Sequence, residues 1–224
     1  MGLLFAFTIA NAQFNEKPII NIENYDEPLL NWGFTLGFNQ YDFKFDYKDD
    51  IGSDLLVSKT LGFNVGLIGE LRLNKFLDLR FEPGLHYNSR KIGFVGFSDI
   101  NDVVREAKST YINFPLLLKA STKRLGNWKP FLVGGFSTSI NLGSNEDSLD
   151  DNSAGTFRMT KNTYYYEIGF GIDFYTAYFK FAPSIRGVFA INDELIPDID
   201  PNSPWTGNIN TMKTRGIFVN FTFE

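Results

Sequence analysis

The chain has 224 residues, which fits one all-β domain or two small domains. Its formal net charge is -5 with 21 Lys and Arg residues, which argues against nucleic acid as a partner, because phosphate binding needs clustered basic residues. There is no cysteine, so disulfides and cysteine-based zinc sites are excluded. The 24 Phe and 10 Tyr residues favour β-strands.

The N-terminus has the features of a secretory signal peptide over residues 1–12. Residues 3–10 are apolar, and Ala10-Asn11-Ala12 fits a small-residue cleavage site before Gln13. The usual positively charged start is missing, so we expect a signal that is truncated at its start or, alternatively, a buried N-terminal strand. No later stretch approaches the roughly 18 apolar residues of a membrane helix. A helical membrane protein is therefore excluded, and a membrane barrel is not.

Apolar residues alternate with polar residues or glycines along most of the chain, which predicts strands with two different faces. Over 164–174 the even positions are aromatic or aliphatic, and the odd positions include Glu167 and Asp173. After a tight turn at 175–176, Lys180 and Arg186 fall on the same polar face. The predicted strands cover about 32–46, 61–73, 77–88, 110–121, 129–141, 164–174, 179–191 and 212–223.

The first predicted strand changes its apolar phase after Phe38, which predicts a bulge near Asn39 and Gln40. The connections after the second, fourth and sixth strands are short, and those after the first, third, fifth and seventh run to about a dozen to twenty residues. This alternation is typical of an outer-membrane barrel with periplasmic turns, extracellular loops and both termini in the periplasm. We predict an all-β, closed, eight-stranded, antiparallel up-and-down transmembrane barrel over 32–224, preceded by a periplasmic segment over 13–31.

A soluble lipocalin-like barrel is the alternative, and its apolar face would point inward. The glycines on the polar face favour the membrane barrel, because they make room for long charged side chains inside a narrow lumen. The alternating C-terminal "GIFVNFTFE" also resembles the aromatic signal that outer-membrane assembly uses.

The charged residues of the polar face are candidates for a structural network that fills the lumen, because buried charges are tolerated when they are paired. A proton or ion path is the sharper and less favoured alternative. The predicted network comprises Glu70, Arg72, Arg80, Glu82, His86, Glu167, Asp173, Lys180 and Arg186.

No strong catalytic motif is present, and we expect no enzyme activity, cofactor or metal. His86 is the single histidine, and a lipid-modifying hydrolase with a Ser-His-acid triad is the less favoured interpretation. The loop 142–155 is acidic but lacks EF-hand spacing. The acidic loops are also candidates for contacts in which divalent cations bridge them to lipopolysaccharide, and the sequence does not decide this point. The proline-rich segment 196–205 is predicted to present Trp205 to a partner or to cap the barrel mouth.

Several stretches carry a resemblance to a known family. They are "NYDEPLLNWGFTLGFN" (24–39), "FEPGLHY" (81–87), "TYINFPLLLK" (110–119) and "KPFLVGG" (129–135). Together they resemble the PorT family of outer-membrane barrels over nearly all of the mature chain. The resemblance implies an accessory or assembly component of the type IX secretion system, which in some species also supports gliding motility. It implies no catalytic residues.

We therefore expect a non-enzymatic barrel in the outer membrane of a Gram-negative bacterium. The expected partners are outer-membrane lipid, lipopolysaccharide, and other secretion-system proteins of the outer membrane and periplasm. The segment 13–31 is a candidate docking site, with Tyr25 and Asp26 as possible contacts. A generic small barrel with a structural or adhesive role is the alternative function.

Overall fold

The computed structural model describes residues 20–48, 55–94 and 103–224. The predicted signal peptide lies outside these residues. The strands are β1 (Leu30–Tyr47), β2 (Leu56–Lys59), β3 (Leu61–Arg72), β4 (Leu77–Phe81), β5 (Gly84–Gly93), β6 (Val104–Ser121), β7 (Trp128–Asn141), β8 (Asn162–Tyr175), β9 (Lys180–Ala190) and β10 (Ile209–Phe223). Two short 3₁₀ helices, η1 (Glu23–Asp26) and η2 (Asn152–Ala154), lie in the connecting segments.

The strands form one closed antiparallel barrel, as predicted. It has eight ribbons, meaning eight positions around the barrel, because β2 and β3 together form one ribbon and β4 and β5 together form another. Closure comes from β1, which pairs with β10 on one side and with β3 on the other. Two ribbons are interrupted. Pro83 has no N–H to donate between β4 and β5, and the pairing with β3 resumes at Gly84. Lys59 of β2 pairs with Arg90, and Phe63 of β3 pairs with Tyr87, so the chain carries one extra residue at the junction of β2 and β3.

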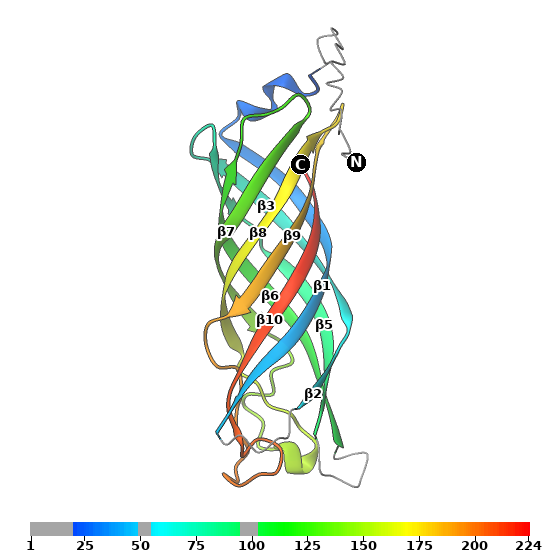
Figure 1. The fold of residues 1–224 in the computed structure, drawn as a ribbon, viewed down its shortest axis with the longest axis vertical. Helices are drawn as coiled ribbons and strands as arrows, with labels where there is room; N and C mark the ends of the chain where they lie inside the picture. Colours follow the sequence, from blue (N-terminus) through cyan, green and yellow to red (C-terminus); the bar gives the residue numbers. More distant parts are fainter. Residues whose placement is uncertain (1–19, 49–54, 95–102) are drawn as a thin grey trace, which may run out of the picture.

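The C-terminus and η1, which follows the first described residues, lie at one end of the barrel, which we call the termini end (Figure 1). The segments 142–161 and 191–208 fold together at the opposite end, the loop end. The strands are strongly tilted against the long axis of the barrel, as closure of a small barrel requires.

Side chains alternate between the lumen and the outer surface, and the outer surface is the apolar one. In β8, Tyr166 and Ile168 are 46% and 64% exposed, whereas Tyr165 and Glu167 are 1% and 3% exposed. The rows of exposed Phe, Leu and Ile continue over β1, β3, β7 and β10. A soluble barrel would bury these rows and expose the charges, so the lipocalin-like alternative is wrong.

The predicted bulge near Asn39 and Gln40 is also wrong. The register with β10 runs without interruption from Phe34 to Asp46 and shifts only at Tyr47. The sequence pattern changes because Phe38 faces outward, at 50% exposed, while Tyr41 faces the lumen, at 2% exposed. A change of environment along a regular strand therefore produced the apparent change of phase.

Lumen-facing aromatic residues of β1 belong to two apolar clusters inside the barrel. One cluster surrounds Tyr41, Tyr111 and Phe218. The other lies at the loop end and joins the strands to both folded loops. Its members are Phe43, Ile92, Phe94, Ala107, Phe157, Met159, Leu195, Ile209 and Met212.

The connection predicted between the third and fourth strands is shorter than expected. β5 and β6 remain paired as far as Gly93 and Val104, so only 94–103 connects them. Residues 89–93 and 104–109 lie outside the predicted strands, and apolar alternation is weak in both stretches. Where a hairpin extends past the apolar outer surface of the barrel, both of its faces tolerate polar residues. The alternation of apolar and polar residues is therefore weak there.

Candidate functional site

Ion pairs fill the half of the lumen near the termini end. At its centre the Glu70 carboxylate lies 3.3 Å from Lys119 Nζ, 3.3 Å from Lys180 Nζ and 3.4 Å from Arg80 Nε. These four side chains come from different strands, and none is more than 2% exposed. A cation left alone at this depth would lose its hydration without compensation, so the mutual pairing is what makes the arrangement tolerable.

Each of the three cations around Glu70 has a second carboxylate partner. Lys119 Nζ lies 2.8 Å from Asp173, and Lys180 Nζ lies 2.8 Å from Glu224. Arg80 contacts Glu82 at 3.1 Å and Glu224 at 3.3 Å. The network therefore links strands on all sides of the lumen rather than forming isolated pairs.

Arg186 extends the network toward the middle of the barrel. Its two terminal nitrogens lie 2.9 Å from Glu167 and 2.8 Å from Glu82. Glu82 is thus shared between Arg80 and Arg186, whereas the described residues give Glu167 no second ion pair. All three members of this branch are buried.

The nine residues of the predicted network all lie on the lumen side of their strands, and eight of them form ion pairs with one another or with further residues. Arg72 pairs with Asp78 at 3.5 Å and with Asp26 at 3.2 Å. Sequence reasoning missed Lys119, Lys129, Asp78 and Glu224 as members. Lys119 follows the unbroken apolar run "PLLL", which hides the alternation, and Glu224 lies beyond the last strand.

His86 is the remaining predicted member, and its surroundings are those of a packing residue. Its Nδ1 hydrogen-bonds to the Tyr41 hydroxyl at 3.3 Å, and its ring contacts the Phe218 ring edge-on at 5.0 Å between centroids. No serine hydroxyl in the described residues hydrogen-bonds to the imidazole. The triad geometry that acyl transfer needs is therefore not assembled around His86.

Close approach of the strands determines where glycine is used in this lumen. An added Cβ at Gly37 would lie 2.5 Å from Asn220 Oδ1 and 2.9 Å from Asn64 Nδ2. Those two amides come from the strands on either side of β1 and hydrogen-bond to each other over Gly37 at 2.9 Å. A larger residue at position 37 would displace this contact.

The segment before β1 lies across the termini end of the lumen, and we call residues 20–27 the plug. Asp26 Oδ1 accepts hydrogen bonds from Arg72 at 3.2 Å and from the Tyr175 hydroxyl at 3.1 Å, and it lies 3.5 Å from Lys129 Nζ. The Tyr25 hydroxyl donates to Glu224 at 3.1 Å. The plug is thus attached to the charge network itself.

A second polar centre lies near the loop end. Arg90 is fully buried, donates to Thr214 at 3.0 Å and to the Tyr111 hydroxyl at 2.6 Å, and stacks 3.8 Å from the centroid of the Phe43 ring. Glu194 reaches the same centre from the segment after β9 and accepts the Thr214 amide at 2.7 Å. Burial raises the pKa of the Glu194 carboxyl. Both residues lie outside the predicted strands, in two of the long predicted connections.

The two folded loops meet around the buried carboxylate of Asp198. It accepts hydrogen bonds from Asn152 Nδ2 at 2.9 Å, from Ser203 Oγ at 2.5 Å and from Thr206 Oγ1 at 2.9 Å. Asp151 accepts the Ile199 amide at 3.2 Å. Hydrogen bonds from the Ser153 hydroxyl and from the Ile199 and Ser153 amides lower the pKa of Asp151.

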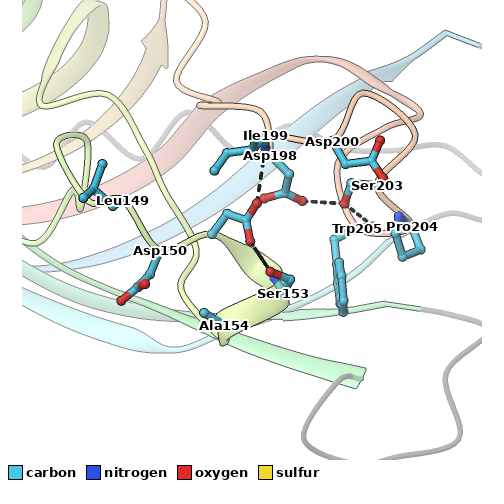
Figure 2. Close-up of a pocket in the computed structure, with 11 residues that line it drawn as sticks. Leu149, Asp150, Ser153, Ala154, Asp198, Ile199, Asp200, Ser203, Pro204 and Trp205 are labelled. Carbon is cyan, nitrogen blue, oxygen red and sulfur yellow. Dashed lines mark hydrogen bonds between the residues drawn. The ribbon is translucent and has the colours of Figure 1, made fainter.

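A hollow of about 370 Å³ lies between these loops (Figure 2). Its lining includes four aspartates together with the ring of Trp205. The ring is half-buried against the loop-end cluster, and the Arg105 guanidinium lies 5.5 Å from its centroid. Trp205 therefore forms one wall at the mouth of the barrel. Within the described residues, no group of three or more His, Asp or Glu side chains is placed to hold a metal ion.

The described residues contain no helix of the length and apolarity that a membrane crossing demands. A closed β-barrel with an apolar outer surface and a charged, filled lumen belongs to the transmembrane barrel class. Residues 11–195, more than half of the chain, match the family model described as outer membrane protein beta-barrel domain. The chain belongs to this family, and its location is the bacterial outer membrane.

The search of solved structures returned several similar proteins of low sequence identity. Neisserial surface protein A is 11% identical over 87% of this chain and 96% of its own, with a TM-score of 0.49. OprG from Pseudomonas aeruginosa is 13% identical over 87% and 93%, with a TM-score of 0.43. Ail of Yersinia pestis, in complex with a heparin analogue, is 12% identical over 86% and 96%, with a TM-score of 0.39. A search of curated proteins found no match.

Proposed function

We propose that this protein is a non-conducting, non-enzymatic scaffold in the outer membrane that acts as an accessory or assembly component of type IX protein secretion. The scaffold role is supported by the filled lumen of the barrel. Buried ion pairs and apolar clusters fill it, the plug covers one end and the folded loops cover the other. Eight strands leave an interior that side chains can fill, so a folded cargo has no path through it.

The secretion role is supported by the resemblance of residues 24–39, 81–87, 110–119 and 129–135 to the PorT family. In this proposal the termini end faces the periplasm, and the plug meets the other secretion proteins. Tyr25 and Asp26 hold the plug against the barrel, and Glu23, Asn24 and Glu27 are exposed beside them. The outward side of the plug is therefore the proposed docking surface, and lipid and lipopolysaccharide contact the barrel wall.

Deletion of the gene tests the secretion role. We expect type IX cargo proteins to accumulate in the periplasm, and affinity purification of the tagged protein from native outer membranes to recover secretion components. A variant with Glu23, Asn24 and Glu27 changed to alanine should lose those components while the barrel still assembles. Intact secretion in the deletion strain would refute the role.

The orientation is tested by labelling introduced cysteines, since the natural chain has none. Ser148→Cys, at the loop end, should react with a membrane-impermeant maleimide on whole cells. Lys75→Cys, at the termini end, should react only after the outer membrane is permeabilised. The reverse pattern would contradict the proposed orientation.

A structural or adhesive role is the second candidate, and the hollow at the loop end favours it. Trp205 gives this hollow an aromatic face, and the surrounding aspartates give it negative charge. Both features suit the binding of a basic ligand. This role predicts that the deletion strain secretes normally and that Trp205→Ala reduces cell attachment. Normal attachment of the variant would argue against it.

A further inference from the structure

A basic pocket of about 330 Å³ lies at the termini end, between two neighbouring turns and the plug. The β3–β4 turn contributes Lys75 and Phe76, and the β6–β7 turn contributes Lys123. The Ser121 amide donates to the Phe76 carbonyl at 2.8 Å, which holds the two turns side by side. The complete lining is Asp26, Arg72, Lys75, Phe76, Thr122, Lys123, Arg124 and Lys129.

The positive charge of this pocket is not balanced. Five of the lining residues are basic, and Asp26 is the one acidic residue among them. Asp26 is already shared between Arg72 and Lys129. Lys75 and Lys123 are exposed, and no carboxylate of the described residues lies within 4.0 Å of either ammonium group. The pocket thus presents free cationic groups to a ligand.

Two arginine guanidinium groups also line this pocket. Arg124 donates to the carbonyls of Gly126 at 2.8 Å and Ile22 at 3.1 Å, and its guanidinium stacks 3.7 Å from the centroid of the Tyr175 ring. Carbonyl oxygens satisfy its hydrogen bonds but leave its charge uncompensated. Arg72 Nη1 is buried and has no hydrogen-bond acceptor in the described part of the chain. An anionic oxygen in the pocket would provide that acceptor.

The pocket borders the lipid-facing surface. Phe76 lines it and is 45% exposed, and Leu73, Leu125 and Trp128 are exposed around the same two turns. Aromatic residues at this level mark the boundary between the acyl chains and the headgroups. Basic side chains beside such a boundary are positioned for headgroup phosphates.

We propose that this pocket binds the phosphate of an anionic phospholipid, with the glycerol and acyl chains directed along the outer surface beside Phe76. Lys75 and Lys123 contact the phosphate oxygens from the two turns. In the orientation proposed above, the lipid belongs to the periplasmic leaflet, and only this assignment of the leaflet rests on the proposed function. A bound lipid would also connect the two turns to the membrane next to the plug.

Native mass spectrometry of the intact barrel in a zwitterionic detergent tests the proposal. The probes are phosphatidylglycerol, phosphatidylethanolamine and inorganic phosphate. We expect saturable binding of one phosphatidylglycerol, weaker binding of phosphatidylethanolamine and little binding of free phosphate. Lys75→Gln/Lys123→Gln should weaken phosphatidylglycerol binding by about tenfold, because the variant lacks two cationic groups that face the phosphate and salt screens part of their attraction.

The matched control is Lys91→Gln/Lys161→Gln, which removes two exposed lysines elsewhere on the barrel. It should bind phosphatidylglycerol like the natural protein. Equal losses in both variants, or no loss in either, would overturn the proposal, and so would tighter binding of free phosphate than of lipid. Heat-modifiable migration on a gel verifies that each variant is folded, and Lys123→Glu provides a second variant with the same expected loss. If the deletion strain secretes normally, the proposed secretion role fails, but the lipid-binding result still stands on its own.

Discussion

Replacement of Arg186 by methionine tests whether the lumen is packed and dry. Arg186 is the ion-pair partner of Glu167 at 2.9 Å and one of two partners of Glu82 at 2.8 Å. In the variant, Glu82 keeps Arg80 at 3.1 Å, whereas Glu167 loses its ion pair. Leaving one buried charge unpaired costs about 3–5 kcal/mol of unfolding free energy. We expect a loss in this range, because methionine fills most of the vacated volume and only one carboxylate is stranded.

Urea unfolding in lipid vesicles, followed by tryptophan fluorescence, measures this loss. The double variant Arg186→Met/Glu167→Gln should recover about 1–3 kcal/mol relative to the single variant, because the stranded charge is gone. Arg215→Met is the matched control. Its guanidinium pairs with Asp42 at 2.8 Å but is 54% exposed, so its loss should be at most about 1 kcal/mol. An equally small loss for Arg186→Met would refute a dry, packed lumen.

Three further predictions concern the plug, the histidine and the loops. Asp26→Asn should weaken the charge-assisted contact to Arg72 by about 1.5 kcal/mol and raise amide exchange in the plug about tenfold. His86→Ala should leave the lipopolysaccharide mass spectrum unchanged, because no serine hydroxyl of the described residues hydrogen-bonds to the imidazole and no Ser-His-acid triad is assembled there. The pKa of Asp151 is lower in the folded protein than in the unfolded chain, so its carboxylate should stabilise the folded loops fully above about pH 4. This stabilisation should be lost as the pH falls through the lowered pKa. The protection of the Ile199 amide against hydrogen exchange measures the loss.

Each of these three predictions has its own control and its own contrary result. Glu23→Gln changes an exposed plug residue and should leave plug exchange unaltered, and an unaltered rate in Asp26→Asn would mean that the plug is held by other contacts. Altered lipid A in the His86 variant would support the enzymatic interpretation. In Asp151→Asn the protection of the Ile199 amide should no longer depend on pH. If the protection still depends on pH, another group is responsible.

The sequence was sufficient for the barrel because its two-residue period is strong wherever one face meets lipid. In 164–174 every second residue is apolar, and the structure exposes these residues and buries the others, except that Ile172 and Gly169 are both half-buried. The period was misleading where the outer surface is no longer apolar. The phase change after Phe38 suggested a bulge, yet the strand continues regularly and Tyr41 packs inside the barrel.

The charge network was only partly accessible to sequence reasoning. Glu167 and Arg186 stand out because apolar neighbours flank them. Lys119 follows three leucines, one of which, Leu117, also faces the lumen, so alternation alone does not separate it from the apolar face. The pairing of Glu70 with Lys180 depends on closure of the sheet, which brings together residues far apart in the chain.

The plug and the folded loops could not be predicted, because their contacts have no periodic signature. Asp26 and Tyr175 meet although about 150 residues separate them. Asn152 and Asp198 likewise come from two loops that join different pairs of strands. Such contacts require knowledge of which strand ends are neighbours around the barrel.

Spin-label accessibility along β8 in lipid vesicles tests the central claim, that the apolar rows face acyl chains and the charges face the lumen. Single cysteines introduced at 164–172 in this cysteine-free chain would each carry a nitroxide. We expect collisions with oxygen, which concentrates in acyl chains, to be frequent at positions 164, 166, 168, 170 and 172 and rare at the positions between them. The opposite phase, or no alternation, would contradict the account.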